Sequence, residues 1–263
     1  MNVFKSTYAA IALAATLAAP TAFASAIHDA NLFTTVLPAN DDGSTGQVNL
    51  GFTANINGTN YTQTYVNNNG NITFNNLLST YTPSAIANGA FGPIIAPFFA
   101  DVDTRAVGSS PVTYGSATLG GFNVFGVNYI NVGVYDAHGP FNSFQMILTS
   151  RSDIAAGDFD IQFNYDQILW DTGDVSSTSA LAGYWTSASS NSTLAGSLVT
   201  GALLDSGPDA LVNHSLNSNV LGQYNFQVRN GQVISNNVPE PASLALLSLG
   251  LLGLVASRRR NTA

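Results

Sequence analysis

Two aspartates, Asp101 and Asp103 in the stretch ADVDTR, are the residues of this chain whose types and spacing most suggest chemistry. In an extended segment, residues two apart point to the same side, so the two carboxylates repel each other unless a partner intervenes. Calcium binds oxygen clusters of this kind, which makes a Ca²⁺ site one hypothesis. Arg105 follows on the same side and offers structural pairing as an alternative, as does solvent. Glycoside hydrolysis also uses paired carboxylates, but it needs a cleft lined for sugar.

The sequence lacks the local signatures of common catalytic sites. It contains no G-x-S-x-G elbow, no H-E-x-x-H motif and no P-loop. Of its three histidines, His138 lies two residues from Asp136, but neither it nor His28 nor His214 has a local partner set typical of a triad. With no cysteine, thiol catalysis and cysteine-ligated metal are excluded. We therefore predict no catalytic residues, and we interpret the histidines as solvated loop residues.

The charge of the middle region, residues 27–237, excludes another class of function. It carries three arginines against fourteen aspartates, a net charge of −11. A nucleic-acid-binding protein needs basic residues to replace the counterions of phosphate groups. We therefore expect no nucleic-acid partner, while the acidity suits solubility and the binding of cations.

Alternating side chains in the middle region predict β-strands. In DFDIQFNYD, the apolar residues Phe159, Ile161, Phe163 and Tyr165 alternate with polar ones, which places one face on a core. NYTQTYV and the turn and strand of NNNGNITF predict a hairpin, because Asn and Gly tolerate tight turns. FNVFGVNYINVGVY predicts two strands separated by glycine.

Short strands between Asn-Gly and Asp-Gly turns, with no helical period, are typical of a sandwich. The expected fold class is therefore all-β, with a single sandwich-like domain over residues 27–237. Trp170 and Trp185 are candidates for contact with polysaccharide, although core packing is favoured for both. Asp171 and Asp174 in WDTGD are interpreted as loop caps.

Several stretches of this region occur in a recognisable order. The most characteristic is IIAPFFADVDTR (Ile94 to Arg105), and the others are YVNNNGNITF, YTPSAI, PVTYG, FNSFQMILTSRSD, GDFDIQFNYDQILWDTGD, AGYW and GQYNFQVRNG. Together they resemble the nidogen-like extracellular (NIDO) domain family over most of residues 38–231. Phe99 stands where tryptophan is common, and Gln223 where arginine is frequent. The resemblance implies a non-enzymatic domain of cell-adhesion, matrix or exported bacterial proteins.

The first residues have the pattern of a secretory signal peptide. Lys5 precedes an apolar run that is too short to span a membrane, and A-x-A cleavage sites follow at Ala24 and Ala26. We predict a signal peptide over residues 1–24, with cleavage after 26 as the alternative.

The last residues, 238–263, combine three features. Val238, Pro239, Glu240 and Pro241 precede an apolar stretch, which predicts a short transmembrane helix over 242–257, and Arg258, Arg259 and Arg260 follow. This tail resembles the PEP-CTERM sorting signal, which implies processing by an exosortase in bacteria that make exopolysaccharide. The helix is short for a hydrocarbon core of about 30 Å, so a transient insertion into the inner membrane is expected. The arginines would stay on the cytoplasmic side.

These features predict an exported bacterial protein of the cell surface or extracellular matrix, with a structural or adhesive domain and without enzymatic activity. Exopolysaccharide and other surface proteins are its candidate partners. The alternative is a secreted polysaccharide-active enzyme or a carbohydrate-binding protein.

Removal of both ends is the first testable expectation. Proline lacks the amide donor and restricts the residue before it, so Pro239 and Pro241 leave an extended strip outside the membrane for a protease. Intact-mass analysis of protein recovered from the surface of its native host should find chains that begin near Ser25 or Ile27 and end near Pro239 to Pro241. Recovery of chains that still carry Arg258 to Arg260 would show a permanent anchor instead.

Overall fold

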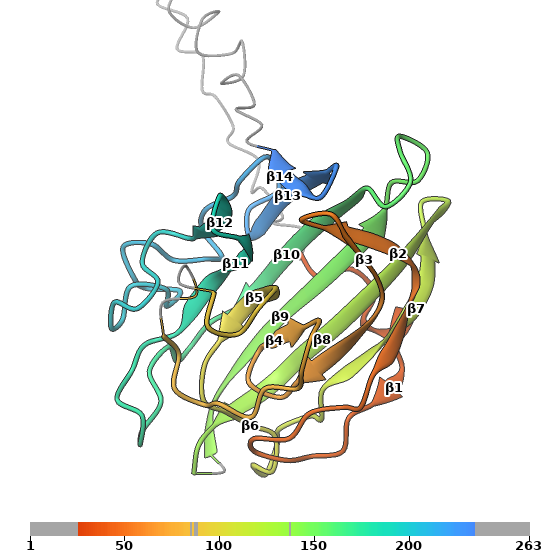
Figure 1. The fold of residues 1–263 in the computed structure, drawn as a ribbon. Coiled ribbons are helices and arrows are strands. Elements are labelled where there is room, and N and C mark those ends of the chain that lie inside the picture. Colours follow the sequence, from red (N-terminus) through yellow and green to blue (C-terminus); the bar gives the residue numbers. More distant parts are fainter. Residues whose placement is uncertain (1–25, 85, 87–88, 137, 235–263) are drawn as a thin grey trace, which may run out of the picture.

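Two antiparallel β-sheets pack face to face and supply the regular structure of the chain (Figure 1). The computed structural model describes residues 26–84, 86, 89–136 and 138–234. Within these residues, the helical structure consists of the 3₁₀ turn η1 (Ala30–Leu32) and a 3₁₀ conformation at Ile86. The predicted all-β sandwich is confirmed.

Each sheet combines a run of consecutive strands with strands from distant parts of the chain. The first sheet has the order β1 (Thr35–Val36), β7 (Thr113–Leu119), β8 (Phe122–Val134), β9 (His138–Ser150), β10 (Phe159–Gln167), β13 (Gln223–Arg229) and β14 (Gln232–Ile234), and β6 (Val102–Asp103) pairs with β8. The second sheet has the order β12 (Ser190–Thr193), β11 (Leu181–Ser187), β5 (Ile94–Phe99), β4 (Asn71–Thr73), β3 (Thr59–Asn67) and β2 (Val48–Ile56).

Strand β10 follows the predicted alternation. Phe159, Ile161, Phe163 and Tyr165 are all buried, and the register places Phe163 opposite Met146 of β9 and Tyr224 of β13. The predicted hairpin is also present, as β3 and β4.

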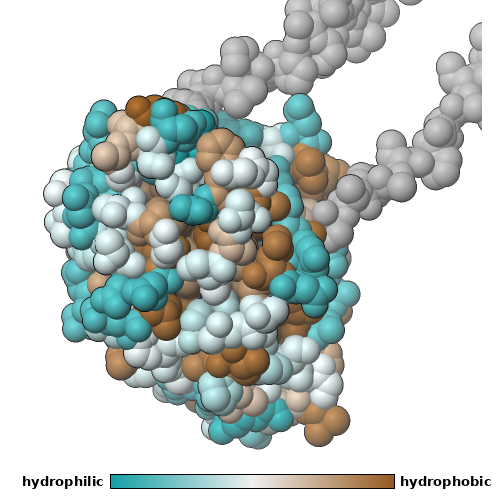
Figure 2. All heavy atoms as spheres, turned by 90° about the vertical axis from the view of Figure 1, so that its right-hand side faces the viewer, coloured by the Kyte–Doolittle hydropathy of each residue, from teal (hydrophilic) through white to brown (hydrophobic). Residues whose placement is uncertain are grey.

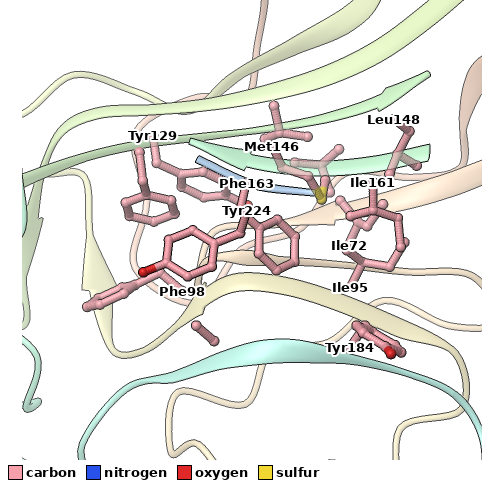
Figure 3. Close-up of a cluster of buried hydrophobic side chains, with 14 of the residues drawn as sticks. Ile72, Ile95, Phe98, Tyr129, Met146, Leu148, Ile161, Phe163, Tyr184 and Tyr224 are labelled. Carbon is pink, nitrogen blue, oxygen red and sulfur yellow. The ribbon is translucent and has the colours of Figure 1, made fainter. Parts of the chain in front are cut away.

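Aromatic side chains fill the space between the sheets (Figure 3). The rings of Tyr129 and Phe144 stack at 4.6 Å, and Phe98 of the second sheet meets Trp170 edge to face at 5.6 Å. The hydroxyl of the buried Tyr129 donates a hydrogen bond to the backbone oxygen of Asn67 at 2.8 Å. The only polar atom of this buried side chain is therefore paired.

The prediction of two strands in FNVFGVNYINVGVY is wrong, because the stretch forms the single strand β8 up to Val134 and leaves out only its last residue, Tyr135. Gly126 does not break it: a Cβ there would lie 2.0 Å from the ring of Phe33, so the missing side chain makes room for that ring. The irregularity comes later, at Asn131, which has a φ of 53° and lies within the shift of register between Tyr129 and Val132. The glycine thus serves close packing and not a turn.

The segment that carries Phe33 covers part of the outer face of the first sheet. Phe33 packs with Val124 and Ile147 in a small cluster separate from the main core. Figure 2 shows the molecule from the right-hand side of Figure 1, and there apolar residues are interspersed with hydrophilic ones.

The two faces of β10 should respond differently to mutation. Phe163→Ala removes a fully buried ring and should lower the free energy of unfolding by about 3–5 kcal/mol. Gln162→Ala, on the opposite face, should change it by less than about 0.5 kcal/mol. Urea denaturation of the two variants and the wild type measures both. Equal losses would show that the assigned core face is wrong.

Candidate functional site

An acidic cavity lies where the loop after β1 meets the turn between β5 and β6. Asp41 and Asp42 come from the loop, and Asp101 comes from the turn. One carboxylate oxygen from each lies within 4.8 Å of the others. The cavity has a volume of about 200 Å³ and is also lined by Tyr81, Tyr135 and Val175. Residues about 60 positions apart in sequence thus meet at one small site.

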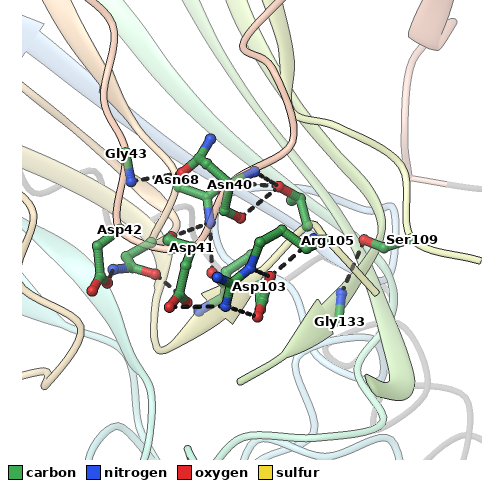
Figure 4. A network of polar contacts seen from close by, with 12 residues as sticks. Asn40, Asp41, Asp42, Gly43, Asn68, Asp103, Arg105, Ser109 and Gly133 are labelled. Atoms are coloured by element: carbon green, nitrogen blue, oxygen red, sulfur yellow. Dashed lines mark hydrogen bonds and ion pairs between the residues drawn. The ribbon is translucent and has the colours of Figure 1, made fainter. Parts of the chain in front are cut away.

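Asparagines of the β3–β4 hairpin hold the loop in place. Asn68 Nδ2 donates to the backbone oxygens of Asp41 and Val102, so one buried amide links the loop to β6 (Figure 4). Asn69 Nδ2 donates to Asp42 Oδ1 at 2.8 Å, and its Oδ1 accepts from the Val102 amide at 2.9 Å. The pattern NNNGN predicts a turn but does not reveal this role of its side chains. Three consecutive asparagine side chains, Asn67 to Asn69, directly after an alternating strand could have indicated such a hydrogen-bonding role.

The structure separates the two aspartates that the sequence paired. Asp103 is fully buried, and its carboxylate accepts hydrogen bonds from the Nε and a terminal nitrogen of Arg105. The distance from Nε to Oδ1 is 2.8 Å. The same guanidinium reaches Asp41 Oδ2 at 3.1 Å. Structural pairing with Arg105, one of the alternatives, therefore holds for Asp103. Asp101 turns instead toward Asp41 and Asp42.

The electrostatics of the cavity disfavour ionised acids. Burial, and then the charges of Asp41, Asp42 and Asp103, raise the pKa of Asp101 to about 7. Burial and the charge of Asp42 raise the pKa of Asp41 to about 6, although Arg105 opposes this shift. Desolvation and like charge both favour the neutral form of a carboxyl group, so Asp101 stays partly protonated near neutral pH, where exposed aspartates are ionised.

A comparison with protein families identifies the domain. The family model described as "NIDO related" matches residues 16–203. The chain belongs to the NIDO-related family. The PEP-CTERM protein-sorting motif matches residues 237–260, which supports an exported surface protein that an exosortase sorts. In the NIDO-related fold described above, the first sheet continues beyond residue 203 with β13 and β14.

Curated relatives share part of this sequence. Human alpha-tectorin is 32% identical over 170 residues, which are 57% of this chain and 8% of the tectorin. Chicken alpha-tectorin is 31% identical over 170 residues, with the same two shares. The chain thus spans about 8% of the length of these relatives. No solved structure matches it significantly.

A third segment of the NIDO-related domain closes over the acidic cavity. A Cβ at Gly173 would lie 2.7 Å from the Cβ of Asp101, so the loop after β10 passes directly against that side chain. Asp171 anchors the loop by accepting from the amides of Gly201 and Leu203, as a loop cap does. Asp174 pairs with His138 at 3.1 Å.

The structure keeps the remaining candidate side chains apart. The backbone amide of His28 donates to the side chain of Gln145, and the ring of His214 meets the backbone oxygen of Ala210. Trp170 is 5% exposed and lies in the core, which excludes it from polysaccharide contact, and Trp185 packs against a second, smaller cluster.

The processing signals fall largely outside the described residues. The residues outside the described ranges include Ala24, the transmembrane helix predicted over 242–257, and the sorting residues Val238 to Pro241 and Arg258 to Arg260. Ala26 is described, and its side chain is buried. Among the residues that the structure describes, no helix is long and apolar enough to cross a membrane.

The raised pKa of Asp101 has a consequence for stability. Between its ordinary value of 3.8 and about 7, the folded chain holds a proton that the unfolded chain releases. The free energy of unfolding in the presence of chelator should therefore fall as the pH rises through this range. Asp101→Asn, which is uncharged at every pH, removes this contribution. Urea denaturation at a series of pH values should give a steeper decline for the wild type, and parallel curves would contradict the assignment.

Proposed function

We propose that the NIDO-related domain is a non-catalytic adhesive or structural module of the cell surface or extracellular matrix. Its sorting motif supports delivery to that place. The observation that carries the adhesive role is a polar groove on the outer face of the first sheet. The groove has a volume of about 340 Å³ and crosses strands β8, β9, β10 and β13.

The lining of this groove suits a hydrated polymer with many hydroxyl groups. Side-chain amides, a guanidinium, a carboxylate, a hydroxyl and the ring of Phe122 line it, and Phe226, whose ring packs against Phe163 and Tyr184 in the core, borders it. The lining residues are Phe122, Thr149, Arg151, Asp160, Gln162, Asn217, Asn225, Phe226 and Gln227. Amide side chains donate and accept at once, as sugar hydroxyls do. The volume lies within the range of about 300–1,000 Å³ that is usual for ligand sites. Exopolysaccharide is the partner class that this chemistry fits best.

Ion pairs hold the charged side chains of the groove in fixed positions. Arg151 pairs with Asp160 and Asp153 at 3.0 Å each, and Arg229 reaches the other oxygen of Asp160 at 2.6 Å. The guanidinium of Arg151 also lies 5.3 Å from the ring centre of Phe122. A surface that is already ordered loses less conformational entropy on binding, which favours adhesion.

The acidic cavity favours a second candidate function, a polysaccharide-active enzyme. Two carboxyl groups with raised pKa values in one cavity are a feature of acid–base catalysis. The volume of about 200 Å³ supports this function less well, because ligand sites usually exceed about 300 Å³. Release of reducing ends from the host's polysaccharide, abolished by Asp101→Asn, would establish the enzyme and refute the non-catalytic proposal.

Binding to matrix polysaccharide tests the adhesive proposal. Gln162 and Gln227 line the groove from neighbouring strands. The double variant Gln162→Ala/Gln227→Ala should weaken binding of the purified protein to exopolysaccharide from its native host by about tenfold, because it removes two amide contacts. The affinity is measured by sedimentation with the polysaccharide, and thermal melting verifies the fold.

A matched control lies on the other sheet. Asn49 and Gln63 form an exposed amide pair at 3.1 Å on β2 and β3, so Asn49→Ala/Gln63→Ala also removes two surface amides. It should leave binding unchanged. Equal losses in both double variants, or no binding by the wild type, would overturn the assignment of the groove.

A further inference from the structure

Two carboxylate oxygens in the acidic cavity are buried and unpaired. Within the described part of the chain, Asp41 Oδ1 and Asp101 Oδ2 have no hydrogen-bond partner. Asp101 is 2% exposed, and it lines the cavity together with Asp41 and Asp42. Buried polar atoms are otherwise almost always paired, so each such exception needs a physical explanation.

The nearby cation does not resolve this imbalance. The Arg105 guanidinium contacts Asp103 and the Oδ2 of Asp41, and it leaves the Oδ1 of Asp41 and the Oδ2 of Asp101 unpaired. Of the four carboxylates of residues 41, 42, 101 and 103, Arg105 therefore contacts two. Asp136 and Asp174 add negative charge near the cavity, and His138 is bound to Asp174. The carboxylates of the site therefore outnumber the positive charges that contact them.

We propose that Asp41, Asp42 and Asp101 bind a calcium ion. The three carboxylate oxygens already converge within 4.8 Å of one another, and a hard divalent cation accepts this ligand type. A cavity of about 200 Å³ has room for the ion and several waters, since each water takes about 30 Å³ in the liquid. Calcium takes six to eight oxygens in flexible geometry, which suits ligands from two separate segments better than the strict octahedron of magnesium does.

This site differs from the one expected from the sequence. Asp103 lies outside the ligand set, because both of its oxygens face Arg105. The ligand set instead takes Asp41 and Asp42 from a loop about 60 residues earlier in the chain.

Calcium bound in this way would tie three parts of the fold together. The loop that carries Asp41 and Asp42 would be linked to the β5–β6 turn through Asp101, against which Gly173 of a third loop is packed. The ion would therefore stabilise the folded domain. This inference does not depend on the adhesive function, because the polar groove is lined by a different set of residues.

Thermal melting of the purified full chain tests the proposal. Extracellular calcium sites have dissociation constants on the order of 10⁻⁴ to 10⁻³ M. Relative to chelator, about 10 mM CaCl₂ should raise Tm by about 5–10 °C, because a ligand that binds only the folded state stabilises it. Titration calorimetry should find one calcium ion per chain. The same concentration of MgCl₂ should give a smaller shift, and NaCl of matched ionic strength controls for screening of the acidic surface.

Three variants separate a ligand role from a general effect of charge. Asp101→Asn should abolish the calcium-dependent shift in Tm. Asp166→Asn makes the same chemical change at an exposed aspartate of β10 and should leave the shift intact. Arg105→Gln removes the cation that competes for Asp41, so it should lower the dissociation constant for calcium by about threefold or more. A merely structural role of the cluster would not produce this tighter binding.

Two results would overturn the proposal. One is a Tm that does not differ between chelator and calcium in the wild type at matched ionic strength. The other is a calcium-dependent shift in Tm that persists in the Asp101→Asn variant, provided that a cooperative melting transition shows this variant to be folded. A response equal for Mg²⁺ and Ca²⁺ would contradict the choice of calcium.

Discussion

The need to pair every buried polar group shapes the centre of this fold, and the run of asparagines in the β3–β4 hairpin meets that need. Asn67 donates to Asn71 and Thr73, Asn68 donates to the backbone of the acidic loop and of β6, and Asn69 contacts Asp42. From the other sheet, Tyr129 donates to the backbone of Asn67. One short hairpin thus binds both sheets and the loop that carries Asp41 and Asp42, and the position of the candidate site depends on it.

The scarcity of positive charge is the second constraint. The middle region has three arginines, and each contacts at least two aspartates: Arg105 with Asp41 and Asp103, Arg151 with Asp153 and Asp160, and Arg229 with Asp158 and Asp160. Two of these arginines order the outer face that carries the polar groove. The third leaves the acidic cavity with more carboxylate oxygens than it neutralises. The small number of arginines therefore has two effects. The side chains of the groove are held by shared ion pairs, and the acidic cavity has more negative than positive charge.

The two proposed sites place separate demands on the domain. The polar groove uses outward-facing side chains of long, regular strands, whose positions follow from the ladder of the first sheet. The acidic cavity uses loop residues, whose positions depend on side-chain hydrogen bonds between loops. The groove and the cavity are lined by different residues, so the proposed adhesion and the proposed cation binding can be tested separately.

The sequence alone determined the fold class, the core face of β10 and the β3–β4 hairpin, because side-chain alternation and turn chemistry are local properties. The order of motifs likewise identified the NIDO-related family and the sorting tail. Only the tertiary structure showed that β8 is one strand, because the ring that fills the space at Gly126 comes from Phe33, about 90 residues earlier. The same holds for the acidic cavity. Spacing paired Asp101 with Asp103, whereas folding gave Asp103 to Arg105 and brought Asp101 to Asp41 and Asp42, since contacts between distant segments are set by packing and buried hydrogen bonds.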